Sequence, residues 1–246
     1  MVAGFGPKIV ITDSIPKRVG DDAMKDTTLR YFRGKTLSDI GDFIENGSIR
    51  LQGFETIMIH VGTNDVSNLM RHNSTVKAEL RLYDFSFLKL MDYTDIVQGF
   101  IALVNIIRQY NRRAVIVFSG IIPRVVDHSR SDPIIRAVNK DIQSFCESHS
   151  SNMLFYPTYR WFVHAGQPVS TYYAKKDKLH LTDVGSARLR QAFQTIMSDT
   201  TLAAQVGVVK EKGAARKRGC RKRVNEWAVQ GSPKRVRTAT NLIQLT

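Results

Sequence analysis

The sequence predicts a three-layer α/β/α sandwich built on a five-stranded parallel sheet, followed by a disordered basic tail. Short apolar strands alternate with amphipathic helices along most of the chain, which is the pattern of parallel sheets. One strand, at 114–119, is apolar at nearly every position and is therefore expected at the buried centre of the sheet. Basic residues gather near the C-terminus. We expect a folded domain over residues 1–206 and a disordered basic tail over residues 207–246.

Five segments have the composition of strands. Their apolar and β-branched side chains, and the turn residues that bound them, favour extended structure. With helices on both faces, such strands give a flavodoxin-like sandwich whose ligands bind beyond the carboxyl ends of the strands. The predicted strands are Lys8–Thr12, Leu29–Phe32, Phe54–Val61, Ala114–Ser119 and Asn152–Tyr156.

Four segments between and after these strands have helical periodicity. One helix begins at Thr36, and the others place apolar residues three or four positions apart on one face. Ile96, Phe100, Val104 and Ile107 form such a face. The three later helices are predicted over Thr94–Tyr110, Asp132–Glu147 and Thr182–Met197.

Composition narrows the class of protein. With 43% hydrophobic and 9% aromatic residues, the 246-residue chain can bury a core, which excludes wholesale disorder. No apolar run approaches the ~18 residues of a spanning helix, and the first ten residues form a strand instead of a signal peptide. We therefore expect an intracellular protein, nuclear or cytoplasmic, with no transmembrane segment and no membrane partner. Cys146 and Cys220 lie in unlike contexts, so a disulfide is not expected.

The net charge of +14 is mostly a property of the tail. Residues 207–246 hold 11 Lys and Arg against two acids, a net of +9, whereas residues 1–206 have a net of +5. Three basic clusters, at 216–218, 221–223 and 234–237, lack an apolar period. This pattern favours nuclear import or nucleic-acid binding through phosphates over a merely solvating tail.

Polar residues follow the strands where a ligand of this fold would bind. Because parallel strands end at one edge of the sheet, these segments are expected to meet. The serine, histidine and aspartate among them are the residue types of an activated nucleophile, its base and an orienting acid. The segments are Thr12-Asp13-Ser14, Arg33-Gly34, Gly62-Thr63-Asn64-Asp65 and Asp177-Lys178-Leu179-His180.

This ordered set resembles the SGNH (GDSL-type) hydrolase superfamily over about residues 8–198. The resemblance implies Ser14 as nucleophile, His180 as base and Asp177 as its acid. It also implies an oxyanion hole formed by the backbone N–H groups of Ser14 and Gly34 and the side-chain amide of Asn64. Thr12 stands where the family has glycine. Because a β-branched residue favours strand conformation, we expect the turn of the nucleophile either to begin one residue later or to sit less tightly against its neighbours.

The resemblance implies a serine esterase that needs neither cofactor nor metal and that cleaves a small acyl ester, an acetyl ester among the candidates. The alternative is a catalytically inactive SGNH-like module that binds nucleic acid or a protein partner, and Thr12 favours it. More narrowly, three segments are similar to SGNH modules of animal genomes, including esterase modules of LINE-type retrotransposons: the Ile-Thr-Asp-Ser-Ile start, HVGTND and DKLHLTDVGSARL. These similarities do not choose between a host gene and a retroelement.

Other residues allow weaker expectations. His60 lies inside a strand and is expected to be a hydrogen-bonded core residue, and Cys146 a structural thiol. Asp65 is expected to fix the turn that carries Asn64. The long stretch 66–93 either lines the acyl pocket or forms an ordinary surface helix. The charges of Lys17, Arg18 and Arg33 near the site favour an anionic substrate.

Overall fold

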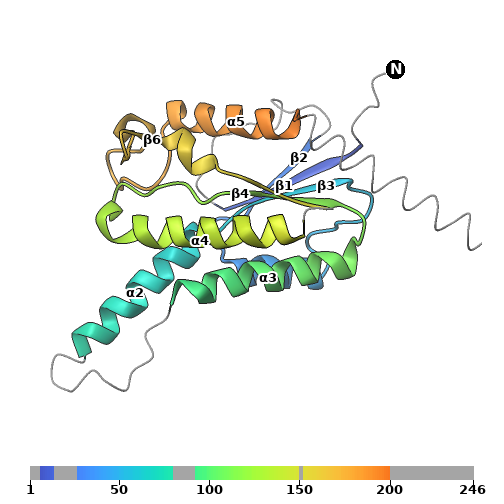
Figure 1. Cartoon of the computed structure of the whole chain (residues 1–246), viewed down its shortest axis with the longest axis horizontal. Coiled ribbons are helices and arrows are strands. Elements are labelled where there is room, and N and C mark those ends of the chain that lie inside the picture. Colours follow the sequence, from blue (N-terminus) through green and yellow to red (C-terminus); the bar gives the residue numbers. More distant parts are fainter. Residues whose placement is uncertain (1–5, 14–26, 80–91, 150–151, 200–246) are drawn as a thin grey trace, which may run out of the picture. The chain divides into compact units, whose positions relative to one another are not determined.

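The computed structural model describes residues 6–13, 27–79, 92–149 and 152–199. Its five-stranded sheet has the order β2-β1-β3-β4-β5, and every pair of neighbouring strands is parallel (Figure 1). This is the flavodoxin order, so the predicted fold class is confirmed. The strands are β1 (Lys8–Thr12), β2 (Thr27–Tyr31), β3 (Thr56–His60), β4 (Val115–Ser119) and β5 (Met153–Tyr156).

The three central strands are buried over their whole length, as continuous apolar runs in parallel sheets require. The prediction for β2 was two residues late at its start. This strand begins with Thr27 and Thr28, which are only partly buried because β2 lies at an edge of the sheet. Its polar, β-branched start therefore gave no apolar signal.

Helices cover both faces of the sheet (Figure 1). Helices α3 and α4 lie on one side, where α3 also packs against α1, and α5 lies on the other side against a short 3-10 helix. The helices are α1 (Leu37–Glu45), α2 (Thr63–Glu79), α3 (Tyr93–Tyr110), α4 (His128–Ser148) and α5 (Asp183–Met197). Two 3-10 helices, η4 (Thr158–Phe162) and η5 (Ser170–Tyr172), and a small hairpin of β6 (Val163–His164) and β7 (Gln167–Pro168) complete the described elements.

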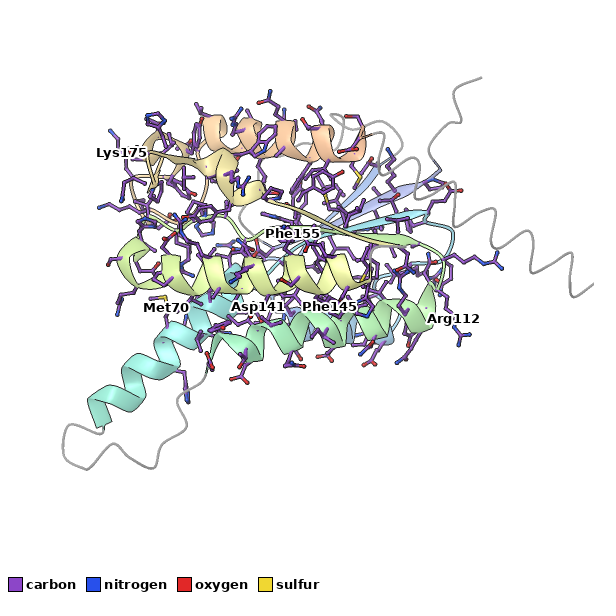
Figure 2. The ribbon with its side chains drawn as sticks, in the orientation of Figure 1. Met70, Arg112, Asp141, Phe145, Phe155 and Lys175 are labelled. Carbon is purple, nitrogen blue, oxygen red and sulfur yellow. The ribbon has the colours of Figure 1, made fainter. Side chains whose placement is uncertain are left out.

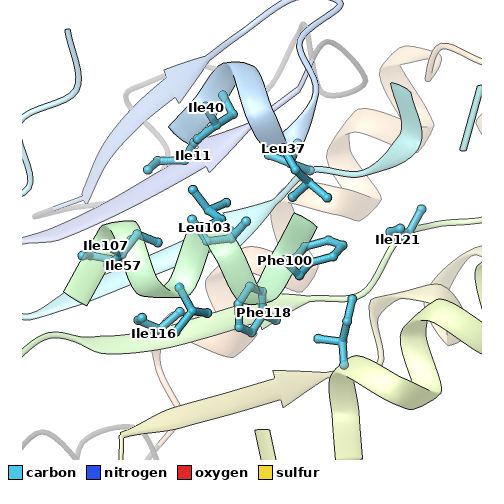
Figure 3. Packing of buried hydrophobic residues seen from close by; sticks show 14 of the residues in the cluster. Ile11, Leu37, Ile40, Ile57, Phe100, Leu103, Ile107, Ile116, Phe118 and Ile121 are labelled. Carbon is cyan, nitrogen blue, oxygen red and sulfur yellow. The ribbon is translucent and has the colours of Figure 1, made fainter. Parts of the chain in front are cut away.

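The core has one cluster on each face of the sheet, because successive side chains of a strand point to opposite faces. Ile57 of β3 joins the cluster beneath α1 and α3, whereas the next residue, Met58, joins the cluster beneath α5. Figure 3 shows Ile57 close to Leu103 and Ile107 of α3. The apolar faces predicted from helical periodicity are thus the buried ones.

Helix α4 begins at His128, four residues before the predicted start at Asp132. In the structure an earlier turn precedes Asp132, in which the N–H groups of Arg130 and Ser131 donate to the Asp127 carbonyl, each at 2.9 Å. Within the described ranges, no helix is long and apolar enough to cross a membrane.

Candidate active site

The polar segments after β2 and β3 meet at the carboxyl edge of the sheet. The side-chain amide of Asn64 donates to the Lys35 carbonyl at 2.9 Å, and both carboxylate oxygens of Asp65 lie 3.3 Å from the backbone nitrogen of Leu37. These bonds join the segment after β3 to the turn between β2 and α1. The structure thus brings the predicted Gly34 and Asn64 segments together, whereas Ser14 lies outside the described residues.

The segment after β1 begins with Thr12, which is the last residue of that strand. Thr12 pairs in register with Tyr31 and His60, and its carbonyl accepts from Phe32 N–H at 2.9 Å. The strand therefore continues through the position where the family has glycine, as its β-branched side chain predicts. Asp13 follows and is buried.

Gly34 occupies a backbone conformation that favours glycine. Its φ is +69°, in the left-handed region, and a Cβ built there would meet nothing within 4 Å. Glycine is therefore required by the conformation of the turn and not by crowding. The open space beside it leaves the backbone accessible, which is what an oxyanion donor needs.

Asn64 is the second residue of α2, so its side chain is held at the start of a helix. The preceding Gly62 has a φ of +124°, and a Cβ there would lie 2.7 Å from Ile121 Cδ1. Glycine thus allows β3 to turn sharply into the helix. The Lys35 carbonyl uses one of the two amide hydrogens of Asn64. Among the described residues, no acceptor takes the second hydrogen.

Asp65 makes a contact beyond the expected one. It accepts from the first backbone N–H of α1 instead of bracing only the turn that carries Asn64. A carboxylate at a helix N-terminus is favourable. Burial nevertheless raises the pKa of Asp65 from 3.8 to about 6, and the charge of Asp39 adds to this effect.

Asp177 and His180, the expected acid and base, are hydrogen-bonded to each other. His180 Nδ1 donates to Asp177 Oδ2 at 2.8 Å, and the backbone N–H groups of Leu179 and His180 donate to Asp177 Oδ1, each at 3.0 Å. Lys178 has a φ of +53°, a left-handed conformation that accompanies this tight turn. Burial opposes ionisation, but these hydrogen bonds together lower the pKa of Asp177 below its ordinary value. In the neutral form of His180 with its proton on Nδ1, Nε2 is the acceptor nitrogen.

The loop that carries this pair is fastened to the segment after β4. Val126 N–H donates to the Lys178 carbonyl at 3.0 Å, and Tyr173 Oη donates to the Pro123 carbonyl at 2.7 Å. Within the loop, Ala174 N–H donates to the His180 carbonyl at 2.8 Å. The histidine is therefore positioned by β4 as well as by its own turn.

Sequence reasoning missed Arg124, which is only 5% exposed. Its guanidinium donates to both carboxylate oxygens of Asp127, at 2.9 and 2.7 Å. It also donates to the Thr63 carbonyl at 3.0 Å and to Ser67 Oγ, both in the first turns of α2. Arg124 thus links the segment after β4 to the helix that begins beside Asn64. The sequence feature that could have identified Arg124 is an arginine three residues before an aspartate, shortly after a buried strand.

The secondary expectations have mixed outcomes. His60 is buried with Nδ1 3.0 Å from Ser119 Oγ, which confirms a hydrogen-bonded core histidine. Cys146 is a buried free thiol whose pKa is raised by burial, consistent with a structural role. The stretch after Val66 begins as helix α2, up to Glu79, while residues 80–91 fall outside the described part. Among the described residues, no group of three or more acidic, histidine or cysteine side chains is placed to hold a metal.

Known proteins resemble this chain in structure. A member of the lipolytic G-D-S-L family from Veillonella parvula superposes with a TM-score of 0.57 at 15% identity, covering 79% of this chain and 98% of the other. The fold is that of the G-D-S-L hydrolases. A carbohydrate esterase family 3 protein from Talaromyces cellulolyticus has a TM-score of 0.54 at 16% identity, covering 83% and 99%. A mutant acetyl esterase with acetate ion gives 0.52 at 15% identity, also covering 83% and 99%.

No protein-family model matches the chain, and no curated protein matches it. At these low identities the likeness extends to the SGNH fold alone. Activity has to be argued from the residues that this chain places at the edge of the sheet. Those are Gly34, Asn64, Asp177 and His180, with Ser14 one residue beyond the described Asp13.

Proposed function

We propose that the chain is a serine esterase that hydrolyses a small acyl ester. The observation that supports this most is the bond of 2.8 Å from His180 Nδ1 to a carboxylate oxygen of Asp177, at the edge of an SGNH fold. The Asp177 carboxylate is held by two backbone N–H groups as well as by His180. A surface histidine without a catalytic role would not need a carboxylate fixed in this way. Such an arrangement fixes the tautomer and orientation of a general base.

Each residue then has one role. Ser14 Oγ attacks the ester carbonyl while its proton passes to His180 Nε2, and Asp177 stabilises the imidazolium. The resulting oxyanion accepts hydrogen bonds from Ser14 N–H, Gly34 N–H and Asn64 Nδ2, each worth about 3 to 4 kcal/mol in comparable sites. His180 returns the proton to the leaving alcohol, and water then cleaves the acyl-serine by the same route.

We propose an acetyl group as the acyl group. Two structural neighbours are described as an acetyl esterase and a carbohydrate esterase, which supports a small acyl group on an alcohol. The roles above use only protein groups, so no cofactor is invoked. Arg33 is exposed beside Gly34, and its charge supports an anionic substrate. Lys17 and Arg18 lie outside the described residues.

Hydrolysis of p-nitrophenyl acetate tests the proposal. The wild-type chain should turn over this ester, and Ser14→Ala should reduce the rate to background because no other nucleophile is proposed. Ser144→Ala is the matched control, since Ser144 is an exposed serine on α4. Equal rates in wild type and Ser14→Ala would exclude the esterase.

The second candidate is an inactive module that binds nucleic acid or a protein partner. Thr12 favours it, because this threonine is fully buried and its Oγ1 has no hydrogen-bond partner among the described residues. Thr12→Gly tests the effect of the departure from the family. A large gain in ester hydrolysis would show that the threonine impairs catalysis, whereas unchanged or reduced activity would show that it does not.

We also propose that the basic segment 207–246 binds nucleic acid through phosphates. Its net charge of +9 supports an affinity that falls steeply with salt and has little sequence preference. Deleting this segment should remove most oligonucleotide binding and leave ester hydrolysis intact. Undiminished binding by the truncated chain would contradict the proposal.

A further inference from the structure

A pocket of ≈ 360 Å³ lies beside the edge strand β2, where the turn after α1 approaches that strand. Ile9 and Ile49, which are buried, give it an apolar floor together with Phe54. The described residues that line it include no acid. Its polar lining is Thr28, Arg30, Ser48, Arg50 and Gln52.

The sheet register places Arg30 on this side of the sheet. Arg30 pairs with Ile11, and Thr28 with Ile9, in parallel strands whose paired residues share a face. Ile9 and Ile11 belong to the cluster beneath α1. Arg30 therefore lies on the α1 side of β2, where the turn bearing Arg50 follows the end of that helix.

Both arginines are exposed and have no hydrogen bond or ion pair within the described ranges. Several other arginines of the body donate to acceptors. Arg108 donates to the Ala114 and Asn152 carbonyls, Arg124 to Asp127, and Arg136 to Asp132. Arg30 and Arg50 thus leave two guanidinium groups available at one pocket.

The last carbonyls of α1, just before the turn that bears Arg50, already have hydrogen-bond donors. The Ile44 carbonyl accepts from Gly47 N–H at 3.2 Å, and the Phe43 carbonyl accepts from Ile49 N–H at 2.8 Å. The Glu45 carbonyl accepts from Tyr110 Oη at 3.3 Å. These bonds satisfy the last carbonyls of the helix. The pocket therefore combines two cations with hydroxyl and amide side chains.

We propose that this pocket binds a small molecule that bears a diphosphate or triphosphate group. The guanidinium fork matches phosphate oxygens bidentately, and the side chains of Ser48, Thr28 and Gln52 add neutral donors. The volume is at the lower end of the range for small-ligand sites. A net of only +5 over residues 1–206 favours a compact site over a track for a nucleic-acid strand.

The pocket is separate from the candidate active site. Leu51 lies in the loop that lines the pocket, and its carbonyl accepts from Asn111 Nδ2 at 2.8 Å. Arg112 follows Asn111 in the chain. Figure 2 shows Arg112 at the end of the domain opposite to Lys175, which lies in the loop of Asp177. The proposal therefore stands independently of ester hydrolysis.

Calorimetric titration of the full chain with pyrophosphate tests the proposal. The double variant Arg30→Gln/Arg50→Gln should weaken binding at least about tenfold, because two charge-assisted contacts are lost. Arg130→Gln/Arg160→Gln removes the same charge from exposed positions outside the pocket and should change the affinity less than about twofold. Arg30→Lys/Arg50→Lys should be intermediate, because lysine keeps the charge without the fork.

Equal weakening in the pocket and control doubles would overturn the proposal, and so would absence of pyrophosphate binding by the wild-type chain. Titration of the same variants with a short oligonucleotide tests the alternative ligand, a nucleic-acid strand. If the pocket variants weaken oligonucleotide binding but leave pyrophosphate binding unchanged, the arginines serve a nucleic-acid strand and the small-ligand site is excluded. Circular dichroism of all variants checks that the fold is kept.

Discussion

The two halves of the candidate site are built differently. The oxyanion half depends on contacts between distant segments, such as Asn64 to Lys35 and Arg124 to Thr63, and Arg124 is almost fully buried. The acid and base half is a local turn in which the side chains of Asp177 and His180 are 41% and 38% exposed. One half is held by contacts between distant segments, and the other is open to solvent.

This difference fits the tasks of the two halves. Oxyanion donors stabilise a transition state only if they are already in place, so fixed helix starts suit them. A general base has to exchange protons with water during each cycle, so exposure suits His180. We therefore expect variants of the exposed half to change chemistry with little cost in stability. Variants of the contacts that hold the oxyanion half, such as those of Arg124, should change both.

The largest expected effect is that of His180→Ala. Without its base Ser14 is a poor nucleophile, so kcat/KM for p-nitrophenyl acetate should fall by about 10³-fold or more, with little change in the free energy of unfolding. His164→Ala, at an exposed histidine of β6, is the control. A variant that kept a tenth of the wild-type activity would show that His180 is not the base.

Asn64→Ala should lower kcat by about 10²- to 10³-fold and leave KM nearly unchanged, because its hydrogen bond strengthens in the transition state. Steady-state kinetics on the same ester measure the two constants. Asn105→Ala, at an exposed position of α3, is the matched control. A loss confined to KM would instead make Asn64 a substrate-binding residue.

Arg124→Met should lower kcat about tenfold and destabilise the fold by about 3 to 5 kcal/mol, because it leaves the Asp127 carboxylate buried without its partner. Adding Asp127→Leu should recover much of the free energy of unfolding, since no buried charge remains. The activity should stay low, because the bond to the Thr63 carbonyl is still missing. Recovery of kcat together with stability would show that Arg124 acts on stability alone.

The smallest effect concerns pH and stability. Burial raises the pKa of Asp65 from 3.8 to about 6, so its stabilising contribution is present below pH 3.8 and is lost as the pH rises to 6. Burial lowers the pKa of His60 from 6.5 to about 4, so its contribution is present above pH 6.5 and is lost as the pH falls to 4. The two effects oppose each other between pH 4 and 6.

Asp65→Asn removes the pH-dependent contribution of Asp65 and leaves that of His60. From pH 7 to pH 4, the free energy of unfolding of this variant should fall by about 2 to 3 kcal/mol more than that of the wild type. Urea denaturation at several pH values measures the difference. Parallel pH curves for the two proteins would contradict the role of Asp65.

The contrast between local contacts and contacts of distant segments also determines how much of the fold and the site could be predicted from the sequence. The central strands of the sheet were predictable because they are continuous apolar runs, and the Asp177 and His180 pair because its local segment matches a motif of the SGNH family that the sequence resembles. The contact of Asp65 with α1 and the bonds of Arg124 to α2 were not predictable, since they join residues 28 and 61 positions apart. Only the folded arrangement determines such partners.

Polar edge positions limited the prediction in the same way. The start of β2 is two threonines, and the pocket beside it depends on the register that places Arg30 on the side of α1. A single arginine in an edge strand resembles any solvated charge. Its proximity to Arg50 follows from the turn after α1, which the hydrophobic pattern does not encode.

The central claim is that Ser14 is a nucleophile activated by His180. The most direct measurement is labelling of the full chain with a fluorophosphonate probe, followed by mass spectrometry of the modified peptide. We expect a single adduct on Ser14 in the wild type, none in Ser14→Ala, and strongly reduced labelling in His180→Ala. An unlabelled Ser14 in folded wild-type protein, or labelling that persists unchanged in His180→Ala, would contradict the account.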